Sequence, residues 1–389
     1  MITAYINGKV IFEDKINEIN VLTRDGVILD VCERFAQADR IVDCAGLYLA
    51  PGFADIHVHG GGGYSAMSDA PEEIVQMCRA HALRGTTSIV PTTLAAPVAR
   101  LQRAIDNIGK AKRMCTDANI LGVHLEGPFL SMAKKGAQSP DNILIPTEEN
   151  LSALLDYSRD ILMIGAAPEV ENGMRVGEEA AKRGIVASIA HSDADFAVAE
   201  EALRHGYSDI THIFSASSAM HKNGIFREVG VAEAGLALDG FTTQFIGDLR
   251  HLPYGAIKLI YHAKGPDRAY AITDGLEYSA LDMEEGTVFT QENGQAVVYE
   301  DSVMKLADRS CLAGSVATSH LLVRNMVKRC VISLTDAVKM ASLTPLKVVG
   351  FDDRKGKIKK GYDEDIILFD EDINVQYVCV NGNVILNNS

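Results

Sequence analysis

Eight short apolar segments recur between residues 50 and 273, and most of them are followed by an amphipathic helical segment. They cover residues 50–59, 88–91, 120–126, 161–166, 185–190, 209–211, 243–246 and 269–273. This alternation predicts an α/β fold, a (β/α)8 TIM-type barrel with parallel strands inside and helices outside. A doubly wound open sheet is the alternative, but its phosphate-binding fingerprint, G-x-G-x-x-G, is absent after the first segment.

Both ends of the chain read as short strands joined by tight turns. Asn7-Gly8 and Asp25-Gly26 are flanked by β-branched residues, which is the pattern of a β-hairpin. Residues 378–385 (VCVNGNVI) repeat the pattern of residues 4–11 (AYINGKVI), which suggests one small β unit built from both termini. A chance repeat of a common turn is the alternative. We predict a small β domain from residues 1–49 and 350–389, and a barrel domain from residues 50–349.

Several local signals predict where elements begin and end. A helix after the first strand is predicted to have Asp69 as its cap, Pro71 in its first turn and Gly85 beyond its end. Residues 276–307 interrupt the alternation with a hairpin-like insert centred on Asn293-Gly294. Helical segments near 316–328 and 334–343 then complete the barrel before Pro345.

Metal-binding types of side chain follow many of these strands. In a barrel, catalytic groups lie at the carboxyl ends of strands. His57 and His59 end the first strand and point to one side of it, because side chains alternate along a strand. The third, fifth, sixth and eighth strands end at Glu126, His191, His212 and Asp274. The five imidazole and carboxylate groups that precede Asp274 predict a site for one or two divalent metals.

Neutral imidazoles with one carboxylate suit zinc best, with iron, cobalt, nickel and manganese as alternatives, and leave a position open for water. Any one of these histidines alone would be read as a core or rim residue. His124 precedes Glu126 on the same strand face; it is either a further ligand or a hydrogen-bond partner of a ligand, and we favour the second.

Asp274 is predicted to move a proton. A divalent metal lowers the pKa of water to about 7 and polarises a carbonyl group. Asp274 follows a buried strand without a ligand partner two residues away, so it can accept the proton and pass it to a leaving nitrogen. Taken alone, Thr273-Asp274-Gly275 would be read as a turn after a strand.

Composition excludes several classes of partner. The formal charge is −15 and no block of lysine or arginine occurs, so neither nucleic acid nor an anionic membrane is expected to bind. Seven scattered cysteines without a C-x-x-C pair indicate reduced thiols and a cytoplasmic protein. The N-terminus lacks the pattern of a signal peptide, and no apolar run approaches the ~20 residues of a membrane helix.

Seven motifs of this chain resemble those of the N-acetylglucosamine-6-phosphate deacetylases of the amidohydrolase superfamily. They are residues 51–60 (PGFADIHVHG), 124–129 (HLEGPF), 167–169 (APE), 190–194 (AHSDA), 211–214 (THIF), 273–275 (TDG) and 312–315 (LAGS). The motifs occur in the family's order over nearly the whole chain, and HLEGP is the most specific of them. The resemblance implies a metal-bearing barrel, a β-sandwich formed by both termini, and a homodimer.

The same resemblance implies roles for individual residues. Glu126, His191 and His212 would bind the principal metal, His57 and His59 a second metal, and Asp274 would transfer the proton. Gln138, in the segment that ends Ala137-Gln138, would face the acetamide. Arg227 and His251 match positions that bind the sugar phosphate, one of them across the dimer; taken alone, Arg227 would be a solvated loop charge. Further residues aligned with the family's substrate site are Ser215, Ala216, Leu312, Ala313 and Gly314.

Two departures from the family pattern concern the sugar. Ser215-Ala216-Ser217 stands where the family usually has Asn-Ala-Met, and Asp248-Leu249-Arg250-His251 replaces Asp-Gly-x-His. Both lie where sugar hydroxyls and phosphate would bind. The predicted reaction is deacetylation of an N-acetylhexosamine 6-phosphate, most simply N-acetylglucosamine 6-phosphate. N-acetylgalactosamine 6-phosphate or another N-acyl amino sugar is the alternative.

Two other functions compete with this one. Amidohydrolases acting on cyclic amides or N-acyl amino acids often use a carboxylated lysine, whereas the corresponding strand here ends at Glu126. A sugar-phosphate-binding protein that has lost catalysis is the second competitor. The presence of all five ligands together with Asp274 argues against it.

Overall fold

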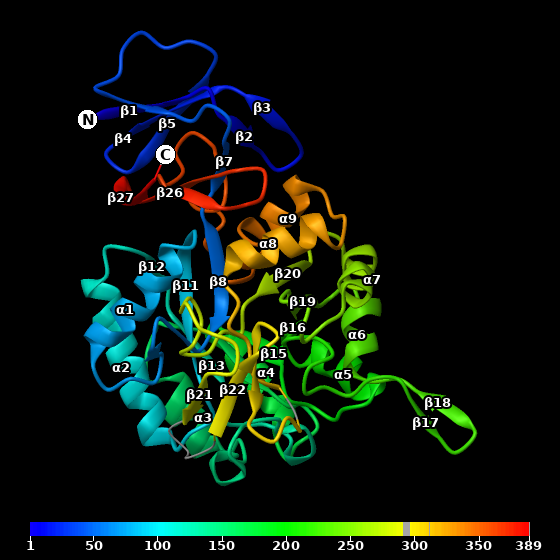
Figure 1. The fold of residues 1–389 in the computed structure, drawn as a ribbon. Coiled ribbons are helices and arrows are strands. Elements are labelled where there is room, and N and C mark those ends of the chain that lie inside the picture. The colour runs from blue at the N-terminus through cyan, green and yellow to red at the C-terminus, as the bar shows by residue number, and fades with distance from the viewer. Residues whose placement is uncertain (291–295, 311, 389) are drawn as a thin grey trace.

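The computed structural model describes residues 1–290, 296–310 and 312–388, and its largest unit is the predicted barrel (Figure 1). Its strands are β8 (Phe53–Val58), β11 (Thr86–Thr93), β13 (Val123–Glu126), β14 (Ile161–Ala166), β15 (Val186–Ile189), β16 (Tyr207–Ile210), β19 (Thr242–Ile246) and β20 (Ala269–Ile272). Each pairs in parallel with the next in this order, and the short β12 (Asn119–Ile120) adds to β11. The predicted fold class is therefore confirmed.

The first and last strands meet just beyond their carboxyl ends. The Asp274 amide N–H donates to the carbonyl of His57 at 3.0 Å, and the His59 N–H donates to the carbonyl of Gly275 at 2.8 Å. A parallel bridge joins Val58 and Gly275. The seam between β8 and β20 is thus made by the same residues that the sequence marks as functional.

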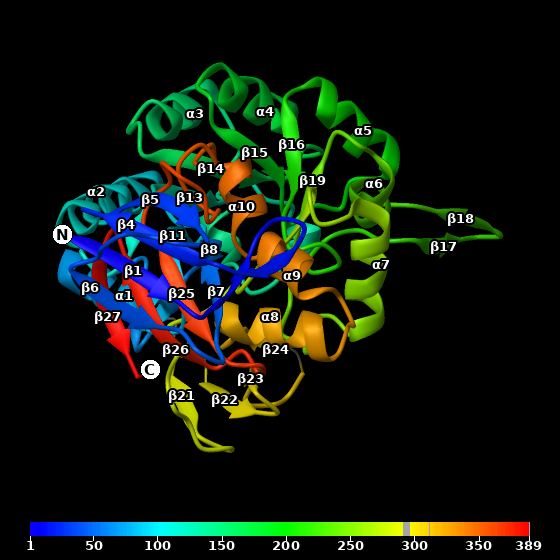
Figure 2. The same cartoon turned by 90° about the horizontal axis from the view of Figure 1, so that it is seen from above.

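Helices surround the strands, as Figure 2 shows from above. They are α1 (Pro71–Ala82), α2 (Val98–Met114), α3 (Glu148–Leu155), α4 (Gly173–Lys182), α5 (Phe196–Arg204), α6 (Val231–Ala237), α7 (Tyr254–Lys264), α8 (Ser319–Lys328), α9 (Leu334–Met340) and α10 (Leu343–Val348). In α2 the buried Leu101, Ala104, Ile105 and Ile108 recur every three or four residues, so one face packs on the barrel.

Two of the predicted boundaries were wrong. Ala70, not Asp69, is the N-cap of α1, because the Asp69 carboxylate is drawn to Arg100 at 2.9 Å. Pro345 does not end the helical region. It lies in the first turn of α10, where the backbone N–H that proline lacks would have no partner within the helix. The predictions of Pro71 in the first turn of α1 and of Gly85 beyond its end, at φ +96°, are confirmed.

Both termini form two sheets that pack as a sandwich beside the barrel, with blue and red segments together in Figure 1. One sheet contains β5 (Val27–Cys32), β4 (Asn20–Arg24), β1 (Ile2–Ile6) and β6 (Arg40–Asp43). The other contains β27 (Asn383–Asn387), β26 (Val375–Val380), β25 (Ile366–Phe369), β7 (Tyr48–Pro51), β2 (Lys9–Ile11) and β3 (Ile16–Glu18). Tyr5, Val21, Leu49 and Tyr377 are buried between them.

The two predicted hairpin turns of the N-terminal segment, Asn7-Gly8 and Asp25-Gly26, connect different kinds of strand pair. Asp25-Gly26 joins β4 and β5 as a hairpin with φ +51° and +80°, as predicted. Asn7-Gly8 was wrongly predicted as a hairpin: β1 pairs with β4 and β6, whereas β2 pairs with β3 and β7. The turn therefore carries the chain from one sheet to the other.

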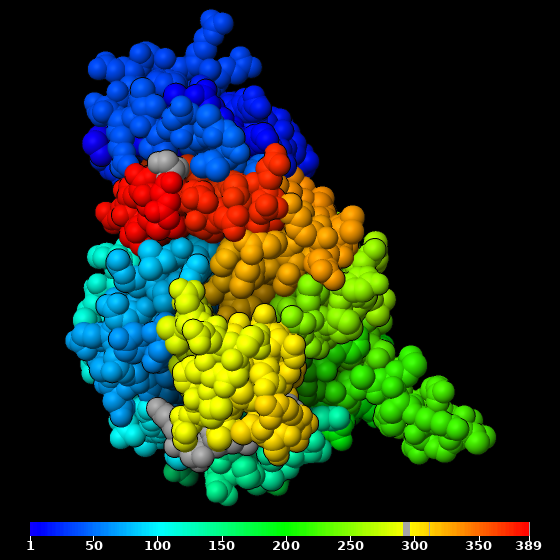
Figure 3. All heavy atoms as spheres, in the orientation of Figure 1, coloured from blue at the N-terminus to red at the C-terminus, as the bar shows by residue number. Residues whose placement is uncertain are grey.

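The insert after β20 forms a separate antiparallel sheet. It contains β21 (Val288–Thr290), β22 (Ala296–Glu300), β23 (Val303–Leu306) and β24 (Leu312–Gly314). Its predicted centre, Asn293-Gly294, lies outside the described residues. In the space-filling view this segment, in yellow, covers part of the front of the barrel, below the terminal sheets (Figure 3). Across the described part of the chain, no helix combines the length and apolar character of a membrane span.

Lys355 is buried between two carboxylates of the sandwich, at 2.7 Å from both Asp363 and Asp365. Asp365 also accepts a hydrogen bond from Asn119 of the barrel at 3.0 Å. Lys355→Met is expected to destabilise the protein by about 3–5 kcal/mol, because two buried carboxylates lose their shared partner. Urea and thermal unfolding measure the change.

Lys357→Met is the matched control. Lys357 pairs with Glu13 at 2.8 Å near the surface, so its loss should cost about 1 kcal/mol or less. Equal effects of the two substitutions would contradict the structural role of Lys355.

Candidate active site

The six side chains predicted as ligands and proton carrier meet at one point on the barrel rim. Glu126 Oε1 lies 2.9 Å from His212 Nε2, 3.2 Å from His191 Nε2 and 3.3 Å from His57 Nε2. Asp274 Oδ1 lies 3.1 Å from His59 Nε2 and 3.4 Å from His57 Nε2. Side chains from five strand ends, separated by more than two hundred residues, thus converge on one volume.

Each of the four imidazoles presents the same nitrogen to this centre. Their Nδ1 atoms lie next to acceptors: Gln244 Oε1 for His57 (2.9 Å), the Thr92 carbonyl for His59 (3.1 Å), the Lys134 carbonyl for His191 (2.9 Å) and the Ser215 carbonyl for His212 (3.0 Å). An Nδ1–H that donates outward leaves a lone pair on Nε2 directed inward. This is how metal-binding histidines are held.

The inward direction of these lone pairs indicates that a cation fits between the side chains. Imidazole lone pairs and carboxylate oxygens repel one another at 2.9–3.4 Å unless a proton or a metal lies between them. His57 Nε2 is buried without a hydrogen-bond partner. Two overlapping groups have ligand atoms close enough to share an ion: His57, Glu126 and His212, and His57, His59 and Asp274. The donor set is one that zinc and similar metals accept.

The charges of the centre shift its pKa values strongly. Burial raises the pKa of Glu126, but the neighbouring His191 and His57 outweigh it and hold the pKa well below its ordinary value. Burial likewise raises the pKa of Asp274, and His57 and His59 outweigh it in the same way. Burial lowers the pKa of His59, yet Asp274 and Glu126 raise it to about 10. Both carboxyl groups are therefore ionised at neutral pH, as a cation site requires.

The backbone at this centre is strained. His191 (φ +46°), His212 (φ +24°) and Asp274 (φ +48°) have positive φ, which non-glycine residues seldom adopt. Each such residue costs about 1–3 kcal/mol and persists only where the surrounding structure holds it. The three residues lie just past strands β15, β16 and β20, with the His191 and His212 side chains directed at Glu126 and the Asp274 carboxylate at His57 and His59.

His124 lies beneath the centre. Its ring is 4.7 Å from that of His57, its Nδ1 faces the carbonyl of Ile56 at 3.1 Å, and its Nε2 is buried without a hydrogen-bond partner. Burial drives its pKa well below the ordinary value. His124 belongs to neither of the two groups that can share an ion.

The centre opens into a cavity of about 1100 Å³. Gln138 lines it and donates from Nε2 to Glu126 Oε2 at 2.8 Å, while its Oε1 accepts from the Ala95 N–H. Eight of the nine predicted substrate residues line this cavity: Ala137, Gln138, Ser215, Ala216, His251, Leu312, Ala313 and Gly314.

His251 and Arg227 differ in position. His251 Nδ1 pairs with Asp248 Oδ2 at 2.7 Å; burial lowers the pKa of His251, but Asp248 outweighs it and raises the pKa. Arg227 lies outside the cavity, on β18 (Phe226–Glu228). This strand and β17 (His221–Asn223) form an exposed hairpin that projects from the barrel (Figure 1).

Some residues of the site were not predicted. Arg100 of α2 lines the cavity and pairs with Asp69 and the carbonyl of Met67. Phe289 and Thr290, in the insert that follows β20, also line the cavity. Gln244 holds His57; its one signal in the sequence is a polar residue inside the apolar strand 243–246.

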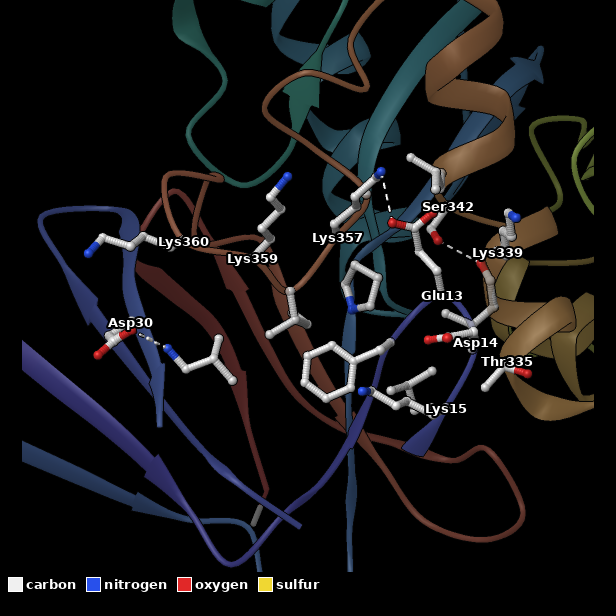
Figure 4. A pocket seen from close by; sticks show the side chains of 18 residues that line it. Glu13, Asp14, Lys15, Asp30, Thr335, Lys339, Ser342, Lys357, Lys359 and Lys360 are labelled. Carbon is white, nitrogen blue, oxygen red and sulfur yellow. Dashed lines mark hydrogen bonds and ion pairs between the residues drawn. The ribbon is translucent and has the colours of Figure 1, made fainter. Parts of the chain in front are cut away.

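A second cavity, of about 410 Å³, lies between the sandwich and α9 (Figure 4). Pro51, just before β8, lines it, so it is at the opposite end of the barrel from His57. Two of the lysines that line it form ion pairs: Lys357 with Glu13 at 2.8 Å and Lys339 with Asp267 at 2.6 Å. None of the described residues that line it is a histidine, and we place the chemistry in the larger cavity.

A barrel that gathers imidazoles and carboxylates at its rim is the arrangement of a metal-dependent hydrolase. Residues 48–250 and 291–385 match the model of the amidohydrolase family. N-acetylglucosamine-6-phosphate deacetylase of Lysinibacillus sphaericus is 32% identical over 91% of this chain and 90% of its own length. N-acetylgalactosamine-6-phosphate deacetylase of Escherichia coli O157:H7 is 28% identical over 86% of each chain.

Solved structures agree. N-acetylglucosamine-6-phosphate deacetylase from Pasteurella multocida superposes with a TM-score of 0.92 and 26% identity, covering 100% of both chains. The chain belongs to the amidohydrolase family and, within it, to the N-acetylglucosamine-6-phosphate deacetylases.

Proposed function

We propose that this protein hydrolyses the acetamide of N-acetylglucosamine 6-phosphate to the amino sugar 6-phosphate and acetate. The observation that carries the proposal is the convergence of four inward-facing imidazole Nε2 atoms and two ionised carboxylates at a cavity of about 1100 Å³. Membership in the family and the names of its relatives support the choice of substrate.

We assign Glu126, His191 and His212 to the principal metal, and His57 and His59 to a second, with zinc as the metal that this donor set favours. A metal held there would lower the pKa of the attacking water and polarise the acetamide carbonyl. Asp274, ionised before the reaction, accepts the proton of the water and passes it to the departing nitrogen. Gln138, held by Glu126 and Ala95, has one N–H left to orient the acetamide.

The phosphate needs cations, and the described lining of the cavity supplies few. Asp69 and the Met67 carbonyl engage the guanidinium of Arg100, whereas Asp248 engages Nδ1 of His251 and raises its pKa, so we assign Nε2 of His251 to the phosphate. We propose that Arg227 of a second copy supplies a further cation, because the hairpin that carries it projects from the barrel. The functional unit would then be a homodimer.

The organisation and location of the protein complete the proposal. We assign residues 1–49 and 350–389 to the sandwich domain and residues 50–349 to the catalytic domain. We place the protein in the cytoplasm; the six cysteines at described positions are all free thiols, which fits a reducing compartment.

A substrate panel tests the proposal. Acetate release is measured with N-acetylglucosamine and N-acetylgalactosamine, each with and without the 6-phosphate. N-acetylglucosamine 6-phosphate is expected to give the highest kcat/KM, at least about 100-fold above the unphosphorylated sugar, because charge-assisted hydrogen bonds to phosphate are lost with it. A preference for the galactosamine compound would favour the alternative, which Ser215 in place of the usual asparagine keeps open.

A zinc-loaded protein that binds these sugars without releasing acetate would refute the enzymatic function. It would favour the sugar-phosphate-binding protein instead.

A further inference from the structure

His57 differs from the other histidines of the centre in what holds its Nδ1. His59, His191 and His212 face backbone carbonyls, which can only accept a hydrogen bond. His57 faces the side-chain amide of Gln244 at 2.9 Å. An amide can present either its oxygen or its NH2 group, and only the oxygen leaves the His57 lone pair on Nε2. Something else must therefore decide which way Gln244 points.

Asp209 lies on the other side of Gln244 and can make this decision. Gln244 Nε2 donates to Asp209 Oδ2 at 2.8 Å, and both side chains are fully buried. Burial raises the pKa of Asp209 to about 6, so the group is a carboxylate at neutral pH and only accepts hydrogen bonds. Turning the amide over would place Gln244 Oε1 against this carboxylate, at the cost of two opposed acceptors in a buried site.

Asp209 is itself held by three further donors, one on β19 beside Gln244 and two on other strands. Ser188 of β15 donates to Oδ2 at 2.7 Å; Thr242 of β19 and Tyr270 of β20 donate to Oδ1 at 2.6 and 3.0 Å. With Gln244, the carboxylate has four donors, which fill its capacity to accept. The network lies inside the barrel, and among the described residues it reaches His57 on β8 through Gln244.

We propose that Gln244 and Asp209 are positioning residues that select the Nδ1–H tautomer of His57 and thereby prepare its Nε2 to bind the second metal. The inference rests on the proposed role of His57 as a metal ligand. Neither residue touches the substrate cavity. Substitution of either residue should therefore change the tautomer of His57 and the affinity for the second metal directly, and the rate of the reaction through that metal.

The tautomer can be read by nitrogen-15 NMR of the histidine rings in the metal-free protein. The spectra are recorded over a pH series so that the neutral His57 ring is the form compared, because without metal a proton can lie between its Nε2 and the carboxylates of Glu126 and Asp274. The His57 signals are assigned by their loss in His57→Gln. Gln244→Leu removes the acceptor, so His57 is expected to shift largely to the Nε2–H form. Asp209→Asn lets the Gln244 amide face residue 209 with either end, so a mixture of both tautomers is expected. The His59 signals, set by a backbone carbonyl, should not change.

Zinc titration of the same proteins measures the consequence. The weaker zinc site is expected to lose about 10–100-fold in affinity in Gln244→Leu, and less in Asp209→Asn, while the site of Glu126, His191 and His212 keeps its zinc. Thr242→Val is the control: it removes a donor from the same carboxylate without touching Gln244, and should preserve both tautomer and affinity.

The outcomes separate this inference from the proposed function. If the nitrogen-15 signals of His57 in Gln244→Leu match those of the wild type, the inference is overturned. If they match the wild type in Asp209→Asn, the role assigned to Asp209 is overturned. A change in Thr242→Val as large as in Asp209→Asn would also overturn it, because the network would then act on the fold in general. If the protein releases no acetate, the proposed function fails, but the His57 ring signals still test the roles of Gln244 and Asp209.

Discussion

Asp274→Asn is expected to lower kcat about 10²–10⁴-fold, the contribution of a positioned acid–base group. The Asp274 carboxylate is ionised, lies within 3.1–3.4 Å of His59 and His57, and faces the cavity. An asparagine of the same shape can neither accept the proton of the water nor return it to the nitrogen. Steady-state acetate release measures kcat, and zinc at Glu126, His191 and His212 should be unchanged.

Asp336→Asn is the control for a general effect of removing a carboxylate. Asp336 accepts a hydrogen bond from Tyr261 at 2.7 Å on the outer helices, so its loss should leave kcat within about two-fold. A kcat near the wild-type value in Asp274→Asn, with a loaded metal site, would remove Asp274 from the proposed mechanism.

Glu126→Gln is expected to abolish tight zinc binding, and with it activity, by a factor on the order of 10³ or more in kcat/KM. Both oxygens of Glu126 are engaged: Oε1 by His191, His212 and His57, and Oε2 by Gln138 and His59. A neutral amide offers no charge to the cation and turns an N–H toward the imidazoles. Elemental analysis of the purified protein and the acetate assay give the two readouts.

A surface pair of the same chemical type provides the control. Glu178 lies 2.6 Å from His205 outside the cavity, so Glu178→Gln should retain both zinc and activity. Full zinc content in Glu126→Gln would show that the principal metal site lies elsewhere.

The strands and the convergence of the candidate ligands were predictable because each carries a local signal. Buried parallel strands appear as apolar runs, and the side chains that matter stand where those runs end, as His191 and His212 do. Asn7-Gly8 failed as a hairpin because its geometry depends on which sheets its two strands join. That choice is made by residues far away, in β4, β6 and β7.

The network behind His57 had a weaker signal. Asp209, Gln244 and Ser188 stand inside apolar strands, where a single sequence does not tell which polar residues face each other across the barrel. Only the register of β15, β16 and β19 brings them together. Arg227 shows the opposite case: its position in an exposed hairpin leaves its predicted role dependent on a second copy of the chain.

The seam between β8 and β20 has a consequence for biosynthesis. His57 and Asp274 hold each other's backbone across the junction where the ring closes. His57, His59 and Glu126 come early in the chain, but the group of candidate ligands is complete only when β20 docks beside β8. A metal bound by residues of the first strand and of the later strands at once would stabilise the closed barrel against separation of β8 from β20.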